Sequence, residues 1–350
     1  MAQKNKIAFF YPSHFPIKGG SSIHGYYLVK YLTEAGLQLI TFPDKPDNIS
    51  IYYPSRFKYI LKAIMQSDVV YVRVHTEGNT RFLPLIAKIC GKKVIVELNG
   101  LPDELKVTKG YSDVRIKYID RRLKLYFRLA DVVITPSKML ADYCKTYLRK
   151  KNVVIIENGG EHFGTNFKNI DEDVYASVMD IRRVHKKIAI WSGTANPWQG
   201  ISMVETLAKI SGIDLGIIII SNDRHVEFTF QTIERVYIYK GLNREEISFI
   251  ISKADVGMAF YDDHHWCRYQ DYYGSSLKYY EYRANGLSVV ATPSGHLKDE
   301  AGPEVFISND ISAMYKWIME HAERKEDNYS YRSWKDVADE TIAVIDKLKN

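Results

Sequence analysis

The sequence predicts an α/β protein made of two doubly wound parallel-sheet domains. Its 350 residues are too many for one compact domain and suit two of ordinary size. Short β-branched runs alternate with helical patterns, which is typical of successive βαβ units. The alternation stops at Glu157-Asn-Gly-Gly160 and starts again at Lys187. We therefore expect Rossmann-like domains over residues 1–162 and 163–330 that face each other across a cleft, with a terminal helix at about 331–350 that packs back on the first.

Each predicted strand is a short, mostly apolar run. In the first domain these runs are Ile7–Tyr11, Leu37–Phe42, Val69–Val74, Lys93–Leu98, Val132–Thr135 and Val153–Glu157. In the second they are Ile188–Trp191, Gly216–Ile220, Val236–Tyr239, Val256–Phe260, Ser288–Thr292 and Glu304–Ile307. Gly36 and Gly91 follow two of the helical stretches, where a glycine commonly ends a helix. Ligands of such sheets bind beyond the carboxyl ends of the strands.

The composition excludes several classes of protein. Apolar residues make up 46% and charged residues 26%, as in a soluble globular chain. Three scattered cysteines exclude a disulfide scaffold and show no metal-binding spacing. Pro12 follows too short an apolar run for a signal peptide, and no run reaches the roughly 18 residues of a membrane span. We expect a cytoplasmic protein.

Positive charge is concentrated in the first half. Residues 1–160 hold 26 basic and 13 acidic residues, whereas residues 161–350 hold 22 and 29. Helically spaced basic residues interleave with apolar ones between 106 and 128, and they include Arg115, Lys117, Arg121, Arg122, Lys124 and Arg128. Such a helix can lie on the anionic inner face of a membrane, or its apolar stripe can pack on the protein's own sheet. No nucleic-acid motif accompanies the charge.

Two loops carry features of a ligand site. Gly19-Gly20 lies between the first strand and a helix that we expect Ser21 or Ser22 to cap, so that free N–H groups there can bind a phosphate or a sugar oxygen. An ordinary glycine turn is the other interpretation, and neither GxGxxG nor a P-loop occurs.

The second loop begins a short helix that Ser275 or Ser276 is expected to cap and Gly286 to end. Lys278 in its first turn and Glu281 share a face, and both charges oppose the helix dipole. A bound phosphate beside Lys278 and a ribose beside Glu281 would explain both.

At this point the sequence resembles the family 4 glycosyltransferases, which have the GT-B fold. Ser276-Leu-Lys-Tyr-Tyr-Glu-Tyr-Arg-Ala-Asn-Gly, followed by Val-Val-Ala-Thr, is similar to their donor-nucleotide motif, and Gly19-Gly20 resembles their N-terminal glycine loop. Further fragments follow in the family's order, and they are Val94–Glu104, Ala130–Ser137, Val154–Gly160, Trp191–Gly193 with Trp198–Gly200, Lys240–Leu242 and Ala254–Gly257.

The resemblance implies a retaining transfer of a hexosyl unit from a UDP- or GDP-linked sugar to a lipid-linked or polysaccharide acceptor, without a metal or other cofactor. The donor-binding residues that it implies are Gly19, Gly20, Leu242, Ser275, Ser276, Lys278 and Glu281. Among these, Lys278 would take the diphosphate, Glu281 the ribose hydroxyls and Leu242 the base. The catalytic candidates on the acceptor side are His75, Asn99 and Glu104.

The chain departs from the family's pattern in ways that keep other functions open. Thr194 and Gln199 stand where an Arg and a Lys are usual, Tyr273 replaces a glutamate, and Asn99 replaces a histidine. A non-catalytic subunit of the same fold, or a sugar-nucleotide epimerase, is the alternative. A metal site at Asp262–Cys267 is disfavoured because the spacing is not that of helical ligands.

Overall fold

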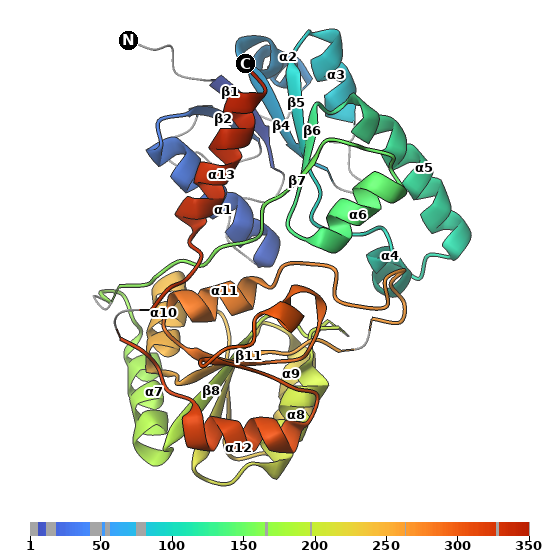
Figure 1. The fold of residues 1–350 in the computed structure, drawn as a ribbon. Coiled ribbons are helices and arrows are strands. Elements are labelled where there is room, and N and C mark those ends of the chain that lie inside the picture. The colour runs from blue at the N-terminus through green and yellow to red at the C-terminus, as the bar shows by residue number, and fades with distance from the viewer. Residues whose placement is uncertain are drawn as a thin grey trace. The chain divides into compact units, whose positions relative to one another are not determined.

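A computed structural model describes residues 6–11, 19–42, 51–52, 57–74, 82–164, 167–196, 198–262, 264–326 and 329–349. The chain divides into two compact units. The first comprises Met1–Asn158, His265–Ser275 and Trp334–Asn350, and the second comprises Gly159–His264 and Ser276–Ser333. Figure 1 shows a sheet with flanking helices in each.

The first unit is built on a seven-stranded sheet in the order β3-β2-β1-β4-β5-β6-β7, in which every pair is parallel. Its strands are β1 (Lys6–Phe10), β2 (Gln38–Phe42), β3 (Ile51–Tyr52), β4 (Val69–Arg73), β5 (Lys93–Glu97), β6 (Val132–Thr135) and β7 (Val153–Ile155). Its helices are α1 (Gly20–Glu34), α2 (Phe57–Gln66), α3 (Leu83–Ile89), α4 (Glu104–Lys109), α5 (Asp113–Leu129), α6 (Lys138–Thr146) and α13 (Trp334–Lys347).

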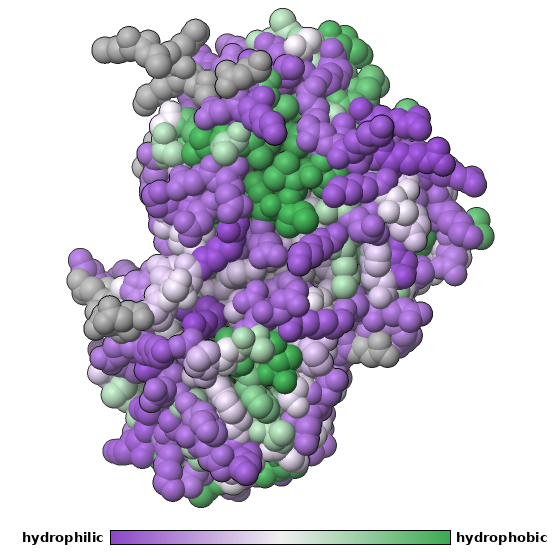
Figure 2. All heavy atoms as spheres, viewed as in Figure 1, coloured by the Kyte–Doolittle hydropathy of each residue, from purple (hydrophilic) through white to green (hydrophobic). Residues whose placement is uncertain are grey.

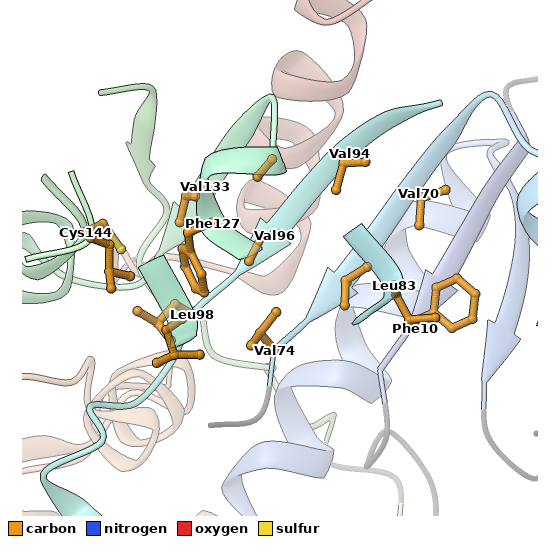
Figure 3. Packing of buried hydrophobic residues seen from close by; sticks show 14 of the residues in the cluster. Phe10, Val70, Val74, Leu83, Val94, Val96, Leu98, Phe127, Val133 and Cys144 are labelled. Atoms are coloured by element: carbon orange, nitrogen blue, oxygen red, sulfur yellow. The ribbon is translucent and has the colours of Figure 1, made fainter. Parts of the chain in front are cut away.

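Apolar side chains bury both faces of this sheet. On one face, strand residues such as Val70, Val94 and Val96 pack against Leu83 of α3 and Phe127 of α5 (Figure 3). Helices α2 and α6 contribute to the same cluster. Helix α1 contacts β2 and lies beside α13 (Figure 1). A sheet whose strands are buried in this way reads as near-continuous apolar runs, which is why the runs were visible in the sequence.

The second unit is built on a six-stranded parallel sheet in the order β10-β9-β8-β11-β12-β13. Its strands are β8 (Lys187–Ser192), β9 (Leu215–Ile220), β10 (Val236–Tyr239), β11 (Val256–Ala259), β12 (Ser288–Ala291) and β13 (Val305–Ile307). Its helices are α7 (Glu172–Val184), α8 (Ile201–Ile210), α9 (Arg224–Phe230), α10 (Arg244–Lys253), α11 (Leu277–Ala284), a 3-10 helix at Gly295–Asp299 and α12 (Ile311–His321). Helices α8, α9 and α12 share one apolar cluster with the sheet, and α11 contacts β11 and β12.

The structure confirms all twelve predicted strands, with ends that shift by one or two residues. It adds β3, whose two residues are too few to form a recognisable run. Gly36 and Gly91 have φ of +93° and +70°, the left-handed conformation expected after a helix.

Three predictions need correction. Neither Ser21 nor Ser22 caps α1: the cap is Gly19, whose N–H donates to Ser22 Oγ at 3.0 Å. The basic segment is two helices, because Gly110 (φ +65°) ends α4 and the Ser112 side chain caps α5. Residues 265–275 belong to the first unit, where the sequence placed them in the second.

Charge pairs and packing explain the third correction. Arg268 forms ion pairs with Asp103 at 2.6 Å and with Asp120 at 3.1 Å, and all three side chains are largely buried. Cys267 and Tyr273 pack in the apolar cluster of the first unit. These residues therefore join the segment to the first sheet, although more than a hundred residues separate it from that sheet along the chain.

Candidate functional site

The start of helix α11 is the part of the second unit where the sequence places a ligand. Ser276 caps the helix, since its Oγ accepts from Tyr279 N at 3.3 Å. The Tyr261 hydroxyl donates to the same Oγ at 2.7 Å, so the segment just after strand β11 and the helix are connected here. Lys278 lies in the first turn, where its positive charge opposes the helix dipole.

The Lys278 ammonium is buried without a hydrogen bond. The residue is 8% exposed, and Nζ has no hydrogen-bond partner among the described residues. It lies 4.6 Å from the ring centre of Trp191 and 5.1 Å from that of Tyr261. Burial lowers the pKa of Lys278 to about 7, although the nearby charge of Asp262 acts in the opposite direction. An anion placed here would supply the missing partner.

A glycine leaves space beside this ammonium. Gly193 follows β8 with φ of +152°, and a Cβ at this position would lie 4.0 Å from Lys278 Nζ. Thr194 and Gln199 in the same loop do not add a charge. Thr194 Oγ1 accepts from Asn196 Nδ2 at 3.0 Å, and the Gln199 carbonyl accepts from Trp191 Nε1 at 3.2 Å.

One turn further along α11, Glu281 forms an ion pair with Arg244 of α10. Both side chains are largely buried, and the Arg244 guanidinium lies 4.5 Å from the ring centre of Phe163. Arg244 follows Leu242 by two residues, so this ion pair brings the Leu242 loop to Glu281. The sequence analysis did not identify Arg244. The Lys240-Gly-Leu242 fragment beside it was the available signal.

Ser275, Gly19 and Gly20 lie in the first unit. The Ser275 hydroxyl accepts from Asn158 N at 3.1 Å, and the Ser275 carbonyl accepts from Asn158 Nδ2 at 2.8 Å. In the second unit the structure therefore groups Ser276, Lys278, Glu281 and Leu242 with Arg244.

The first unit contains a buried polar cluster at the end of β5. Glu97 is 1% exposed and accepts hydrogen bonds from the Tyr71 hydroxyl and from Asn99 Nδ2. His24 Nε2 lies 3.2 Å from Glu97 Oε1. Burial raises the pKa of Glu97, but His24, Arg73 and Tyr71 together lower it to about 2. The carboxylate is therefore ionised.

The hydrogen bonds of this cluster define the proton state of His24. Asn158 Nδ2 donates to a backbone carbonyl, so its Oδ1 faces His24 Nδ1 at 2.7 Å. An amide oxygen and a carboxylate both accept, and both ring nitrogens must then carry protons. Burial lowers the pKa of His24, but Glu97 and Asn158 raise it above its ordinary value. These partners make His24 an imidazolium paired with Glu97.

Two of the three acceptor-side candidates, Asn99 and Glu104, are among the described residues, and both lie near this cluster. Asn99 donates to Glu97, and Glu104 accepts from the Tyr273 hydroxyl. Burial raises the pKa of Glu104, while Tyr273 and the charge of Arg73 act against it. Tyr273, which stands where the resembled family has a glutamate, lies in the first unit. His75 lies outside the described residues.

Metal ligands do not cluster in the described part of the chain, where no three His, Cys, Asp or Glu side chains could hold an ion together. Asp263 of the discounted metal segment lies outside it. None of the described helices combines the length and apolarity that a membrane crossing requires.

No family model and no curated protein matches the sequence, but solved structures match its fold. Sucrose-phosphate synthase from Thermosynechococcus elongatus is 15% identical with a TM-score of 0.70, and 99% of each chain is covered. Anabaena HepE in complex with UDP-glucose is 12% identical with a TM-score of 0.68, over 98% of this chain and 99% of that one. A Rickettsia africae glycosyltransferase is 14% identical with a TM-score of 0.64, over 99% of both.

The chain has the GT-B fold. At these identities the likeness establishes architecture alone, so activity has to be argued from the site.

Proposed function

We propose that the protein is a retaining glycosyltransferase that moves a hexosyl unit from a nucleotide sugar to a lipid-linked or polysaccharide acceptor. The observation that carries the proposal is the Lys278 ammonium, which is buried at the start of α11 without a hydrogen-bond partner among the described residues. A buried charge of this kind is costly unless an anion completes the site. The diphosphate of a sugar nucleotide is such an anion.

The residues around Lys278 suit the rest of the nucleotide. The first turn of α11 begins at Leu277, and the start of a helix favours a phosphate. Of the N–H groups there, that of Ser276 already donates to His296 Nε2 at 2.7 Å and that of Tyr279 to Ser276 Oγ, so the N–H groups of Leu277 and Lys278 would meet the anion. Glu281, held by Arg244, would accept hydrogen bonds from the ribose hydroxyls, and Leu242 would contact the base. The HepE structures contain UDP or UDP-glucose, which makes a UDP-linked donor the first to test.

In the proposed reaction the bond between the anomeric carbon and the diphosphate oxygen breaks. The diphosphate takes the electron pair, and Lys278 with the helix dipole stabilises its charge. The acceptor oxygen bonds the anomeric carbon on the same face, and the hydroxyl proton leaves with the diphosphate. The reaction requires no metal, because the ammonium and the helix supply the positive charge.

The acceptor side of the proposal rests on the first unit. The proposed catalytic residues there are His75, Asn99 and Glu104, and we propose that Gly19 and Gly20 would bind the donor phosphate. Burial raises the pKa of Glu104, which suits a carboxyl group that exchanges a hydrogen bond with a sugar hydroxyl. The six basic residues of α5 support an acceptor at the cytoplasmic face of a membrane.

Two other functions have specific support. Thr194 and Gln199 add no cation beside Lys278, which would suit a non-catalytic subunit. The structure of a putative UDP-N-acetylglucosamine 2-epimerase from Listeria monocytogenes matches this fold with a TM-score of 0.56 at 13% identity, which would suit an epimerase.

Calorimetric titration of UDP, GDP and ADP tests the donor site. We expect one nucleotide to bind the wild type, and we expect Lys278→Met and Glu281→Ala each to weaken binding by at least about tenfold, the loss of one charge-assisted contact. Lys316→Met, which removes an exposed lysine from α12 of the same unit, should bind as the wild type does.

Product analysis then distinguishes the transferase, the epimerase and the non-catalytic subunit. Release of nucleotide diphosphate with formation of a glycoside supports the transferase, and conversion of the sugar within the nucleotide supports the epimerase. Failure of all three nucleotides to bind would contradict the proposed donor site and favour the non-catalytic subunit.

A further inference from the structure

Three helices of the first unit cover one face of its sheet. Ala63 and Ile64 of α2, Leu83 of α3, and Leu123 and Phe127 of α5 all pack into one apolar cluster with the strands. Since the inner sides of these helices meet the same sheet face, their outer sides point away from it together. We call these outer sides the three-helix face.

This three-helix face exposes an unusual number of apolar side chains. The described residues expose seventeen large apolar side chains in all, and nine belong to these helices or to the residue before α3. They are Phe57, Leu61, Met65, Phe82, Leu85, Ile89, Val114, Tyr118 and Leu125. Those of α2 recur every four residues, so they form a single row along the helix. Ile89 and Val114 are each 77% exposed.

The apolar rows lie side by side. Helices α3 and α5 contact each other, and the Phe82 and Tyr126 rings meet edge to face at 5.6 Å. Lys92, just after α3, donates to the Met65 carbonyl at the end of α2 at 3.0 Å. Figure 2 shows green side chains at the surface over α3 and at the outer end of α5, among purple ones. An exposed patch of this extent marks an interaction site in most proteins.

The charge of the three-helix face is strongly positive. Residues 57–66, 82–89 and 113–129 contain nine basic and two acidic residues. Of the two acidic residues, Asp120 is turned inward, where it pairs with Arg268. The basic residues Lys58, Lys62, Lys117 and Arg121 are exposed among the apolar rows. A second copy of the chain would bring like charges together, so the complementary partner is an anionic one.

We propose that the three-helix face binds an anionic lipid bilayer by inserting its apolar rows between headgroups, while the surrounding Lys and Arg contact the lipid phosphates. Apolar insertion combined with basic residues is the pattern of surfaces that lie on membranes. The basic residues of α5 alone indicated an electrostatic attraction to anionic lipid. The exposed apolar residues of α2 and α3 add side chains that can insert into the bilayer. This inference deepens the acceptor side of the proposed function, and it does not depend on the donor site.

Vesicle co-sedimentation of the full chain tests the proposal. Vesicles contain phosphatidylcholine alone or with about 30% phosphatidylglycerol, an anionic content at which basic surfaces bind. One variant carries Phe57→Ser, Met65→Ser and Ile89→Ser, and a second carries Arg121→Glu, Arg122→Glu and Lys124→Glu. The matched control carries Ile213→Ser and Phe228→Ser, which are 65% and 71% exposed in the second unit.

We expect the wild type and the control to pellet with anionic vesicles, and both to stay in solution with phosphatidylcholine alone. Each of the two other variants should lose at least about tenfold in vesicle affinity, since each removes one of the two contributions. All variants should keep the wild-type thermal midpoint, because the substituted side chains lie at the surface.

Three results would overturn the proposal: no pelleting of the wild type, equal pelleting of the serine variant, or a wild-type dimer that the serine variant converts to a monomer. Calorimetry with UDP on the same proteins keeps the two proposals apart. A variant that no longer pellets with vesicles but binds UDP as before has lost only the membrane-binding surface. A variant that pellets as before but no longer binds UDP has lost only the donor site.

Discussion

Folding buries the Lys278 side chain with no hydrogen-bond partner among the residues that the structure describes, so its proton equilibrium is coupled to folding. Burial lowers its pKa from 10.5 to about 7. Between these pH values the unfolded chain holds the proton and the folded chain has released it. The contribution of Lys278 to stability therefore rises with pH across this window, by up to about 1.4 kcal/mol per pH unit.

Replacement of this lysine should stabilise the protein while it weakens donor binding. At pH 7 we expect Lys278→Met to raise the free energy of unfolding by about 1–3 kcal/mol, because an unpaired polar group leaves the interior. The gain should shrink as pH rises to 10. Urea unfolding at pH 7 and pH 9 measures both effects, with Lys316→Met as the control. An unchanged pH dependence in Lys278→Met would contradict this account.

Donor binding should itself take up a proton above pH 7. The free protein then carries a largely neutral Lys278, and a diphosphate restores the charged form because an adjacent anion raises the pKa. Calorimetry with UDP at pH 8, in buffers of different ionisation enthalpy, should give apparent enthalpies that vary with the buffer. A buffer-independent enthalpy would show that Lys278 does not meet the diphosphate.

The contribution of His24 to stability depends on pH with the opposite sign to that of Lys278. The pKa of His24 is raised in the folded state, so its contribution to stability is complete below 6.5 and is lost as pH rises through the folded value. The contribution of Glu97 is complete above 4.5 and is lost as pH falls towards about 2. The pair is therefore strongest between about pH 4.5 and 6.5.

His24→Gln removes one partner and leaves the Glu97 carboxylate buried. At pH 6 we expect a loss of about 3–5 kcal/mol in the free energy of unfolding, and a smaller loss at pH 9. His225→Gln, an exposed histidine of α9, is the control and should have no effect. Equal losses for His24→Gln at pH 6 and pH 9, measured by urea unfolding, would mean that His24 is neutral.

Residues that stand out by their position in a helix could be singled out from the sequence, and their tertiary partners could not. Lys278 and Glu281 stood out because their charges oppose the dipole of a helix visible in the sequence. The Arg244 partner of Glu281 lies 37 residues away, and Glu97 lies 73 residues from His24. No periodicity or spacing connects such pairs.

At the scale of elements, hydrophobic runs predicted the strands because parallel strands are buried on both faces. Helix ends were harder. The expected caps Ser21 and Ser22 both lie inside α1, and Gly110 divides a basic segment that helical periodicity alone continues across. At Gly110 the left-handed backbone ends the helix, and at Gly19 the cap uses backbone groups, so the side-chain pattern reports neither boundary.

Helix α11 packs closely against Gly160, which lies outside the helix. A Cβ at Gly160 would lie 2.1 Å from the Tyr280 carbonyl oxygen and 2.5 Å from the Ala284 Cβ. Gly160→Ala should therefore displace α11, with a loss of about 1–3 kcal/mol in the free energy of unfolding and weaker UDP binding. Gly164→Ala has nothing within 4 Å of the new Cβ and is the matched control. Equal stability of the two variants in urea would show that α11 is free to shift.

At the scale of the whole molecule, the chain leaves and re-enters the first unit twice. The sequence predicted the break near residue 160, where the alternation of elements stops. It did not predict that residues 265–275 return, because the ion pairs of Arg268 with Asp103 and Asp120 hold them there. Such contacts become visible only when residues far apart in the sequence are placed together.

The last segment, residues 334–350, is the piece of the first unit whose removal tests this division. Trp334 is 1% exposed, stacks on Tyr27 at 5.6 Å and meets the His24 ring edge to face at 5.2 Å. A chain that ends at residue 333 loses these contacts and bares one side of α1, so amides of α1 should exchange at least about tenfold faster.

Hydrogen exchange read by mass spectrometry separates the units in this experiment. Strands β8 and β9 of the second unit are buried independently of α13, so their protection should stay at the wild-type level in the shortened chain. A chain that lacks only Lys349 and Asn350 keeps α13 and should exchange as the full chain does. If β8 and β9 lost protection together with α1, the two units would unfold as one, and the stability of each could not be assigned to its own core.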